Sequence, residues 1–408
     1  MIHQADRRTW AEIDLGAISE NVRIINKILD GKSKIMAIVK ADAYGHGAAF
    51  VARELAECGV DFFGVSSLDE ALQLRENGIT QDILILGYTN PDEKNTEKLI
   101  KYNIIQTVFD FDYAEALSNN KNQNKNQIIR AHIKIDTGMN RLGFKYTGKN
   151  KDINIIAKIK AIKNMRNIKT EGIFTHFAVA DEKKSGFTQE QFGLFCELVA
   201  ALEKEDIYFD VKHAANSGAT INFKETHLDY VRPGLILYGL YPSKSTAEPG
   251  VGLVPAMRLK TIISQISTVR QGETVSYGRT YRPGKDILCA TLPIGYADGF
   301  SRLLSNSASV IINGRQAPVI GRVCMDQSMV DVTHCGDVKA GDAVTVFGRG
   351  AGPAAGAGGS ISVEHVAEMM ETINYEVVCL IGKRVPRIFC KNGEETGYLN
   401  YIIPDARE

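Results

Sequence analysis

The sequence predicts an α/β fold in which a (β/α)8 TIM-like barrel is followed by a mainly-β C-terminal domain. Between about residues 15 and 240, short β-rich runs alternate with amphipathic helical stretches, and eight such units match the size of this barrel. After about residue 245 the pattern changes to short strands separated by turn signals. The 408 residues, 44% of them hydrophobic, supply enough apolar side chains for both cores.

Eight runs are the candidate strands of the barrel. In chain order they are KIMAIVK (34–40), DFFGVSS (61–67), DILILGY (82–88), NIIQTVF (103–109), IRAHIKID (129–136), IKTEGIFTHF (168–177), VKHAAN (211–216) and LDYVR (228–232). Helical stretches such as FVARELAEC (50–58) and ALQLREN (71–77) lie between them, and Ser67 with Glu70 forms a capping-box pattern before the latter. A doubly wound open sheet would give a similar string, so the periodicity leaves the closure of the sheet open.

The second half contains three β-rich segments and one helix. The segments are RLKTIISQISTVRQGETVSYG (258–278), SVIINGRQAPVIG (309–321) and GDAVTVFG (341–348), and Asn313-Gly314 is a typical hairpin turn. The helix is expected over roughly 361–381, and the low-complexity stretches 119–127 and 348–360 are expected to be loops. We expect a barrel domain over residues 14–245 and a mainly-β domain over 246–408, which residues 1–13 join.

Composition indicates a soluble, cytoplasmic protein that acts on small molecules. Lys plus Arg equals Asp plus Glu, at 48 each, so no net field attracts nucleic acid or anionic lipid. The first ten residues contain no apolar signal-peptide core, and no apolar run is long enough to span a membrane. Seven cysteines without a CxxC pair favour free thiols, and the eight histidines show no spacing typical of a metal site.

Polar residues follow several predicted strands, and barrels carry their catalytic groups at these strand ends. The residues that this rule selects are Lys40, Tyr44, Asp136, Arg141, His176, Asn216, Ser217 and Arg232. Lys40 ends an apolar strand, where burial would favour the neutral amine that Schiff-base chemistry requires. The alternative is a solvated surface lysine, which is the usual place for this residue type.

The loops after the seventh and eighth strands suit a phosphate group. They read HAANSG (213–218) and RPGL (232–235), and Ser217, Gly234 and Leu235 offer a hydroxyl and backbone N–H groups. Arg-Pro-Gly also fits an ordinary turn, and that alternative stays open. A phosphate site together with a strand-end lysine indicates pyridoxal phosphate, since no P-loop or GxGxxG motif is present to hold a nucleotide.

Nine motifs follow one another in chain order over nearly the whole length of the sequence. They are AIVKADAYGHG (37–47), KIDTGMNRLGF (134–144), THFAVAD (175–181), HAANSGA (213–219), VRPGLILYG (231–239), VSYGRTY (275–281), LPIGYADG (292–299), GRVCMDQSMVDV (321–332) and INYEV (373–377). In these motifs the sequence resembles the alanine racemases. The resemblance implies an enzyme that interconverts L-alanine and D-alanine with pyridoxal 5'-phosphate. It further implies a homodimer with shared active sites, and a supply of D-alanine for peptidoglycan.

The resemblance also assigns roles to individual residues. Lys40 would carry the cofactor and act as one acid/base catalyst, and Tyr277 of a partner subunit would be the other. Arg232 would face the pyridine nitrogen, with His176 near the ring. The phosphate would be held by Tyr44, Ser217, Gly234, Leu235 and Tyr375, with Asn216 close by. The substrate carboxylate would contact Arg141 and the backbone at Met325, and Tyr296 would narrow the entrance.

Lys134 and Asn140 lie close in sequence to Arg141. Lys134 aligns with a lysine that some family members carry as a carbamate, which makes that modification an option here. Asn140 stands where many members have glycine, and asparagine is the residue that next best tolerates a left-handed conformation. The loop that carries Arg141 is therefore expected to keep its shape.

Three alternative functions remain at this point. A broad-specificity amino-acid racemase would share the scaffold, and pocket size would distinguish it. A pyridoxal-phosphate-dependent decarboxylase would be expected to lack VSYGRTY and CMDQSMVDV, which are both present. A non-catalytic cofactor-carrier barrel would end near residue 240, whereas this chain continues and carries Tyr277.

Overall fold

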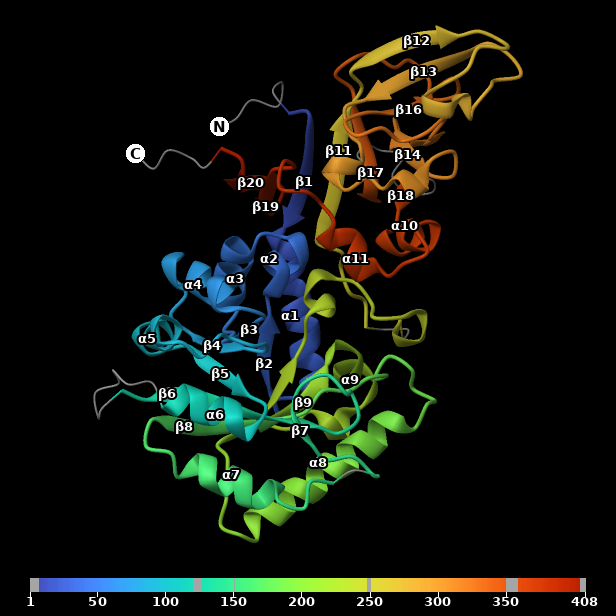
Figure 1. The fold of residues 1–408 in the computed structure, drawn as a ribbon. Coiled ribbons are helices and arrows are strands. Elements are labelled where there is room, and N and C mark those ends of the chain that lie inside the picture. The colour runs from blue at the N-terminus through green and yellow to red at the C-terminus, as the bar shows by residue number, and fades with distance from the viewer. Residues whose placement is uncertain (1–6, 120–126, 150, 248–250, 350–358, 404–408) are drawn as a thin grey trace. The chain divides into compact units, whose positions relative to one another are not determined.

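The computed structural model describes residues 7–119, 127–149, 151–247, 251–349 and 359–403 (Figure 1). The chain divides into two compact units. The barrel unit consists of Ala17–Tyr44 and Ala48–Val254, and the β unit consists of Met1–Gly16, Gly45–Gly47 and Pro255–Glu408. The domain limits expected from the sequence, 14–245 and 246–408 with 1–13, stay a prediction.

A closed parallel barrel forms the centre of the barrel unit. Its eight strands, counted over the described residues, are β2 (Lys34–Ile38), β3 (Phe62–Val65), β4 (Asp82–Ile85), β5 (Ile105–Val108), β6 (Ile129–Asp136), β8 (Ile168–Phe174), β9 (Val211–Asn216) and β10 (Tyr230–Arg232). Each pairs in parallel with its neighbours, and the β5–β6 and β10–β2 pairings close the circle. All eight predicted strands are confirmed, and the closure excludes the open sheet.

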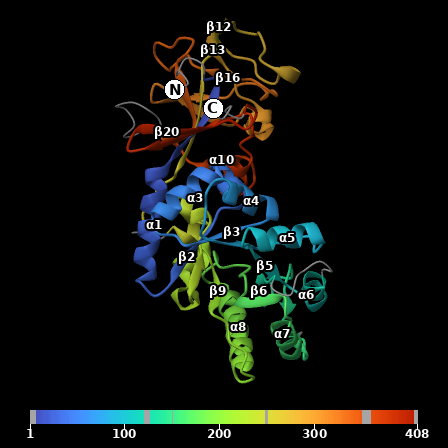
Figure 2. The same cartoon turned by 90° about the vertical axis from the view of Figure 1, so that its left-hand side faces the viewer.

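Helices alternate with the strands along the chain and lie outside the barrel (Figure 2). They are α1 (Leu15–Leu29), α3 (Ala48–Glu57), α4 (Leu68–Glu76), α5 (Glu93–Lys101), α6 (Phe111–Ser118), α7 (Ile155–Lys163), α8 (Phe187–Glu203) and the short α9 (Ser217–Asn222). A small strand, β7 (Phe144–Lys145), pairs with the end of β6. Met36, Phe62, Leu84 and Ile105, one from each of the strands β2 to β5, form a buried apolar cluster.

The capping box predicted before α4 is only half formed. The Ser67 hydroxyl accepts the Glu70 N–H, as an N-cap should. The Glu70 carboxylate, however, accepts the N–H groups of Ser66 and Ala41 at 2.7 Å each. Because the residues after β2 supply a competing donor, Glu70 supports the loop that follows Lys40.

The β unit is built around an extended sheet. Its strands run in the order β15 (Arg315–Pro318), β14 (Ser309–Ile312), β17 (Ala343–Arg349), β11 (Met257–Ile262), β1 (Thr9–Asp14), β19 (Arg387–Lys391) and β20 (Glu394–Leu399), with β18 (Ser360–Ile361) on β17. Strands β12 (Gln265–Val269), β13 (Ile287–Leu292) and β16 (Ser328–Asp331) form a separate sheet. The Asn313-Gly314 hairpin is confirmed, because both residues have positive φ and Ile312 pairs with Arg315.

The prediction of a single helix over 361–381 is wrong. The structure has α10 (Val363–Met369) and α11 (Asn374–Cys379), separated by a turn in which Glu371 has φ 54°. The β-branched Thr372 and Ile373 favour extended backbone over helix, and Ile373 is extended here. Most of the two low-complexity stretches, 119–127 and 348–360, lies outside the described residues.

The described residues contain neither a metal-type cluster nor a membrane-spanning helix. No disulfide bond joins any of the seven cysteines. Within the described ranges, no cluster of His, Cys, Asp and Glu side chains has the geometry of a metal site. Among the same residues, none of the helices has both the length and the apolar character needed to cross a membrane.

Candidate active site

Arg232 is the centre of a buried hydrogen-bond network in the barrel unit. It ends β10 and is only 3% exposed. Its guanidinium donates to the carbonyl groups of Thr175 and Ala214, at 2.8 and 2.9 Å. It also contacts Nδ1 of His213 at 2.8 Å and Nδ1 of His176 at 3.1 Å. The structure thus brings Arg232 and His176, both residues that the sequence selected, into direct contact.

Arg232 determines which ring nitrogen of each histidine carries the proton. A guanidinium has only N–H donors, so Nδ1 of His176 and of His213 must be the acceptors. Burial, followed by the Arg232 charge, holds the pKa of both rings well below its ordinary value. Both histidines are therefore neutral and carry their proton on Nε2.

A third histidine extends the network deeper into the barrel. Nε2 of His213 lies 2.9 Å from Nδ1 of His132, and the His213 ring stacks on Phe174 with a centroid distance of 4.6 Å. Burial, followed by the Arg130 charge, lowers the pKa of His132 to about 3. Sequence reasoning missed His132 and His213, which lie within strands and not at their ends.

Arg232 keeps its charge in this surrounding. Burial, followed by the Arg141 charge, lowers the pKa of Arg232 to about 9. The side chain therefore remains protonated near pH 7, and its four acceptors all favour the charged form.

A cradle for an oxyanion lies after β9 and β10. The buried Ser217 hydroxyl accepts the N–H of Gly234 at 2.9 Å. A Cβ atom at position 234 would lie 2.5 Å from the Tyr44 hydroxyl oxygen, so glycine is needed for this close approach. Two hydroxyl groups thus converge on the backbone at Gly234 and Leu235, where the Gly234 N–H is already donated to Ser217. Asn216, which precedes Ser217, caps α9 by accepting the N–H of Ala219.

Lys40 leads into an unusual backbone conformation. Residues 41–44, the body of α2 (Lys40–Gly45), all have φ between 51° and 55°, which makes a left-handed helical turn. This conformation costs L-residues roughly 1–2 kcal/mol each. Bonds from the Ala43 N–H to Val39 and from the Ala48 N–H to Asp42 help to hold it. Lys40 itself is half-buried, two residues beyond the end of β2.

The loop after β6 places a second group of cations near this point. Asp136 accepts the N–H groups of Gly138 and Asn140 at 3.0 Å each, and Asn140 has φ 55°. The expected left-handed conformation of Asn140 is thereby confirmed. Burial, followed by the charges of Arg141 and Arg232, lowers the pKa of Lys134 to about 8. The Lys40 charge acts in the same direction, so these side chains share one neighbourhood.

The β unit carries the other four predicted site residues. Tyr277 belongs to η5 (Tyr277–Arg279) and is 69% exposed. Tyr296 begins η6 (Tyr296–Asp298), Met325 follows Cys324 in a loop, and Tyr375 is half-buried in α11. The side chains of Tyr296 and Met325 are exposed as well.

Hydrogen bonds join the loops of Tyr277, Tyr296 and Met325. The N–H groups of Tyr296 and Ala297 donate to the carbonyls of Cys324 and Met325, at 3.0 and 3.1 Å. The Ser276 hydroxyl donates to the carbonyl of Arg322 at 2.6 Å. These loops therefore form one connected platform, although each predicted residue comes from a different segment.

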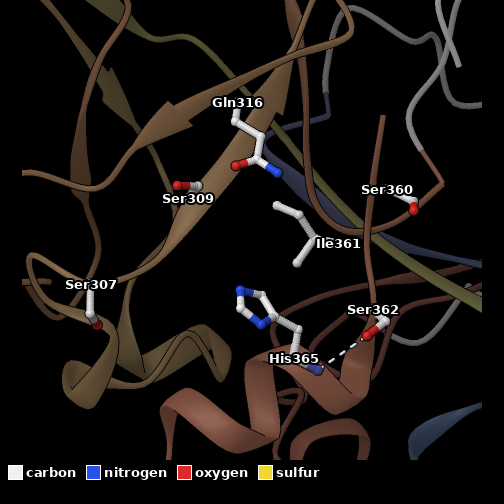
Figure 3. Close-up of a pocket in the computed structure, with 7 residues that line it drawn as sticks. All are labelled: Ser307, Ser309, Gln316, Ser360, Ile361, Ser362 and His365. Atoms are coloured by element: carbon white, nitrogen blue, oxygen red, sulfur yellow. Dashed lines mark hydrogen bonds between the residues drawn. The ribbon is translucent and has the colours of Figure 1, made fainter. Parts of the chain in front are cut away.

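A separate hollow of about 250 Å³ lies elsewhere in the β unit (Figure 3). Its lining is mostly polar and consists of Ser307, Ser309, Gln316, Ser360, Ile361, Ser362 and His365. The Ser362 hydroxyl accepts the N–H of His365 and thereby caps α10. The hollow contains no residue that the sequence assigned to the site.

Comparison with known proteins identifies both units. Residues 13–242 match the family model "Alanine racemase, N-terminal domain", and residues 256–389 match "Alanine racemase, C-terminal domain". Alanine racemase of Clostridium perfringens is 46% identical over 396 residues, which is 97% of this chain and 99% of the relative. Alanine racemase 1 of Clostridium acetobutylicum is 43% identical with the same coverage. The solved alanine racemase of Clostridium difficile 630 has a TM-score of 0.90 at 37% identity, covering 98% of this chain and 100% of its own.

Proposed function

Because the chain belongs to the alanine racemase family and is an amino-acid isomerase, we propose that it interconverts L-alanine and D-alanine with pyridoxal 5'-phosphate. Lys40 and Tyr277 are the two acid/base catalysts of this proposal. The observation that carries it is the convergence of the half-buried Lys40, the buried Arg232 and the Ser217–Gly234–Tyr44 cradle in the barrel unit.

The residues present fit the cofactor. Its phosphate would be held by the hydroxyl groups of Tyr44 and Ser217 and the backbone at Gly234 and Leu235, with Asn216 close by and the Tyr375 hydroxyl contributing. Lys40 would carry it covalently. When bound, the cofactor withdraws electrons from the α-carbon of the amino acid.

Arg232 and His176 would contact the cofactor ring. Arg232 would face the pyridine nitrogen as a hydrogen-bond donor that keeps its own proton, since its pKa of about 9 is far above that of a pyridine-type nitrogen. His176 is held neutral against Arg232 and would lie beside the ring without adding charge.

Racemisation requires one proton transfer on each face of the α-carbon. A single base on one face returns the proton to the side from which it came, so inversion needs a second group opposite. Lys40 supplies the amine on one face, and the Tyr277 hydroxyl supplies the group on the other. Arg141 and the backbone at Met325 would hold the substrate carboxylate, and Tyr296 would limit the size of the side chain that enters.

Tyr277 is proposed to complete the site of a partner subunit, which makes the active form a homodimer with shared sites. Its 69% exposure in the single chain agrees with this role, because an aromatic ring so exposed on a conformationally restricted turn is available to a second copy. We further propose that the enzyme is cytoplasmic and supplies D-alanine for peptidoglycan.

In deuterated water, the wild-type holoenzyme is expected to convert L-alanine to D-alanine and to place deuterium at the α-carbon of the product. Chiral chromatography coupled to mass spectrometry measures both. Alanine that stays in the L form without deuterium would falsify the proposal. Parallel reactions with L-serine and L-lysine test the broad-specificity alternative, which requires turnover comparable to that of L-alanine.

Gly234→Ala is expected to weaken cofactor binding by about tenfold or more, because overpacking against Tyr44 costs roughly 1–3 kcal/mol. Titration of the apoenzyme with pyridoxal phosphate, followed by absorbance, gives the dissociation constant. Gly193→Ala is the control, since a Cβ atom there meets open space. Equal affinity in the two variants would count against the cradle.

A further inference from the structure

Asp298 is a buried carboxylate in the β unit that no part of the proposed mechanism uses. It closes η6 and is 1% exposed. In the described part of the chain it accepts four hydrogen bonds: Nε and Nη2 of Arg384 at 2.7 and 3.2 Å, Nη2 of Arg8 at 3.1 Å and the Gly295 N–H at 2.9 Å. A carboxylate so deeply buried is stable only when such partners surround it, so its position is tightly determined.

The two arginines connect Asp298 to the loop of Met325. Nη2 of Arg384 donates to the Asp326 carboxylate at 2.7 Å and to the Met325 carbonyl at 3.5 Å. Nη2 of Arg8 also reaches the Asp326 carbonyl at 3.2 Å. A planar guanidinium holds two acceptors in a fixed relation, which a lysine could not do. The spacing between the Tyr296 turn and the Met325 loop therefore depends on these side chains.

The segment directly after α11, the helix that carries Tyr375, also contacts Asp298 and its neighbours. The Gly382 N–H donates to the Asp298 carbonyl at 3.1 Å. A Cβ atom at Gly382 would lie 2.8 Å from the Ala297 carbonyl oxygen, and one at Gly299 would lie 2.6 Å from that of Leu380. Leu380 immediately follows α11, so backbone contact at these glycines transmits the position of Asp298 to Tyr375.

We propose that Asp298 and Arg384 form a positioning pair that sets the spacing of Tyr296, Met325 and Tyr375 and thereby determines which amino-acid side chains the enzyme accepts. This inference rests on the proposed function. Tyr296 and Met325 expose their side chains, so packing of those side chains within the unit does not fix them. The fixed element is the backbone beneath them, and the charged pair holds that backbone.

The pair is tested by kinetics of holoenzyme variants with L-alanine and the larger L-serine. Asp298→Asn keeps the shape of the side chain but replaces one acceptor oxygen with an amide that faces arginine donors. We expect the KM for L-alanine to rise about tenfold, with a much smaller change in kcat, and the preference for alanine over serine to fall about fivefold or more. Arg384→Lys, which keeps the charge and loses the fork, is expected to show an intermediate effect in the same direction.

Glu395→Gln is the matched control. Glu395 forms a two-bond pair with Arg7 at 2.7 Å in the same unit, and neither residue belongs to the loops of the site. The melting temperature of every variant is measured alongside. We expect Glu395→Gln to lower the melting temperature while the KM and the alanine-to-serine ratio stay within about twofold of wild type.

The outcomes separate this inference from the function on which it rests. If Asp298→Asn lowers the melting temperature but leaves KM and the substrate ratio like those of Glu395→Gln, the pair is purely structural and the inference is wrong. If Asp298→Asn does not fold, Arg384→Lys decides by the same two readouts. If the wild type does not racemise alanine at all, the proposed function fails and this inference fails with it.

Discussion

Replacing Lys40 with alanine is expected to lower the rate of alanine racemisation by at least about 10⁴-fold in both directions. The amine is proposed both to carry the cofactor and to transfer a proton on one face, so its loss removes two functions together. Chiral chromatography measures the rate. The mass of the intact chain after borohydride reduction shows whether pyridoxal phosphate is covalently attached, which we expect in the wild type and not in Lys40→Ala.

Lys34 provides the control at the start of β2, the strand that leads to Lys40. It begins β2 at the opposite end, is exposed, and pairs with Asp61 at 2.8 Å. Lys34→Ala is expected to keep both the activity and the covalent cofactor, because an exposed pair contributes little to stability. Racemisation by Lys40→Ala within a hundredfold of the wild-type rate would contradict the role assigned to this lysine.

The backbone conformation next to Lys40 supports the role proposed for this lysine. Four consecutive residues after it adopt a left-handed conformation that L-residues avoid. Strained backbone persists only where its surroundings hold it, and it concentrates at functional sites. Glu70 supplies part of that hold by accepting the Ala41 N–H. The strain and its support both lie in the segment that fixes the direction of the Lys40 side chain.

The barrel could be predicted because its signals are local. Each strand is a short apolar run such as KIMAIVK, and the Asn313-Gly314 turn needs only two residues to define it. The prediction failed where two local signals competed. Glu70 bonds to the loop of Ala41 instead of completing a capping box, and the β-branched pair Thr372-Ile373 divides a stretch that has helical periodicity.

The site residues, too, could be predicted only where the signal is local. Lys40, Ser217 and Arg232 follow from the rule that barrels place chemistry at strand ends, and the resemblance supplied residues such as Tyr277 and Met325. Their roles stay proposals. His132 with His213, and Asp298 with Arg384, were missed because each pair joins residues more than 80 positions apart. Spacing along the chain contains no signal for such contacts, which only the fold creates.

Tyr277→Phe is expected to separate inversion from proton exchange, which no loss of folding would do. Racemisation should fall about 10³-fold in both directions, because the base on one face is gone. Lys40 remains on the other face, so one enantiomer of alanine should still exchange its α-proton for deuterium while keeping its configuration. Incubating L-alanine and D-alanine separately in deuterated water, followed by chiral separation and mass spectrometry, gives both quantities.

Tyr281→Phe is the matched control for this experiment. Tyr281 lies four residues further along, and Val275 pairs with it across the turn that carries Tyr277. Removal of its hydroxyl changes the same segment without removing the proposed base, so wild-type inversion and exchange are expected. If Tyr277→Phe inverted alanine at the wild-type rate, Tyr277 would not be a base. If Tyr277→Phe lost exchange with both enantiomers, the two proton transfers would not be independent. A two-base mechanism in which Lys40 alone acts on one face would then be wrong.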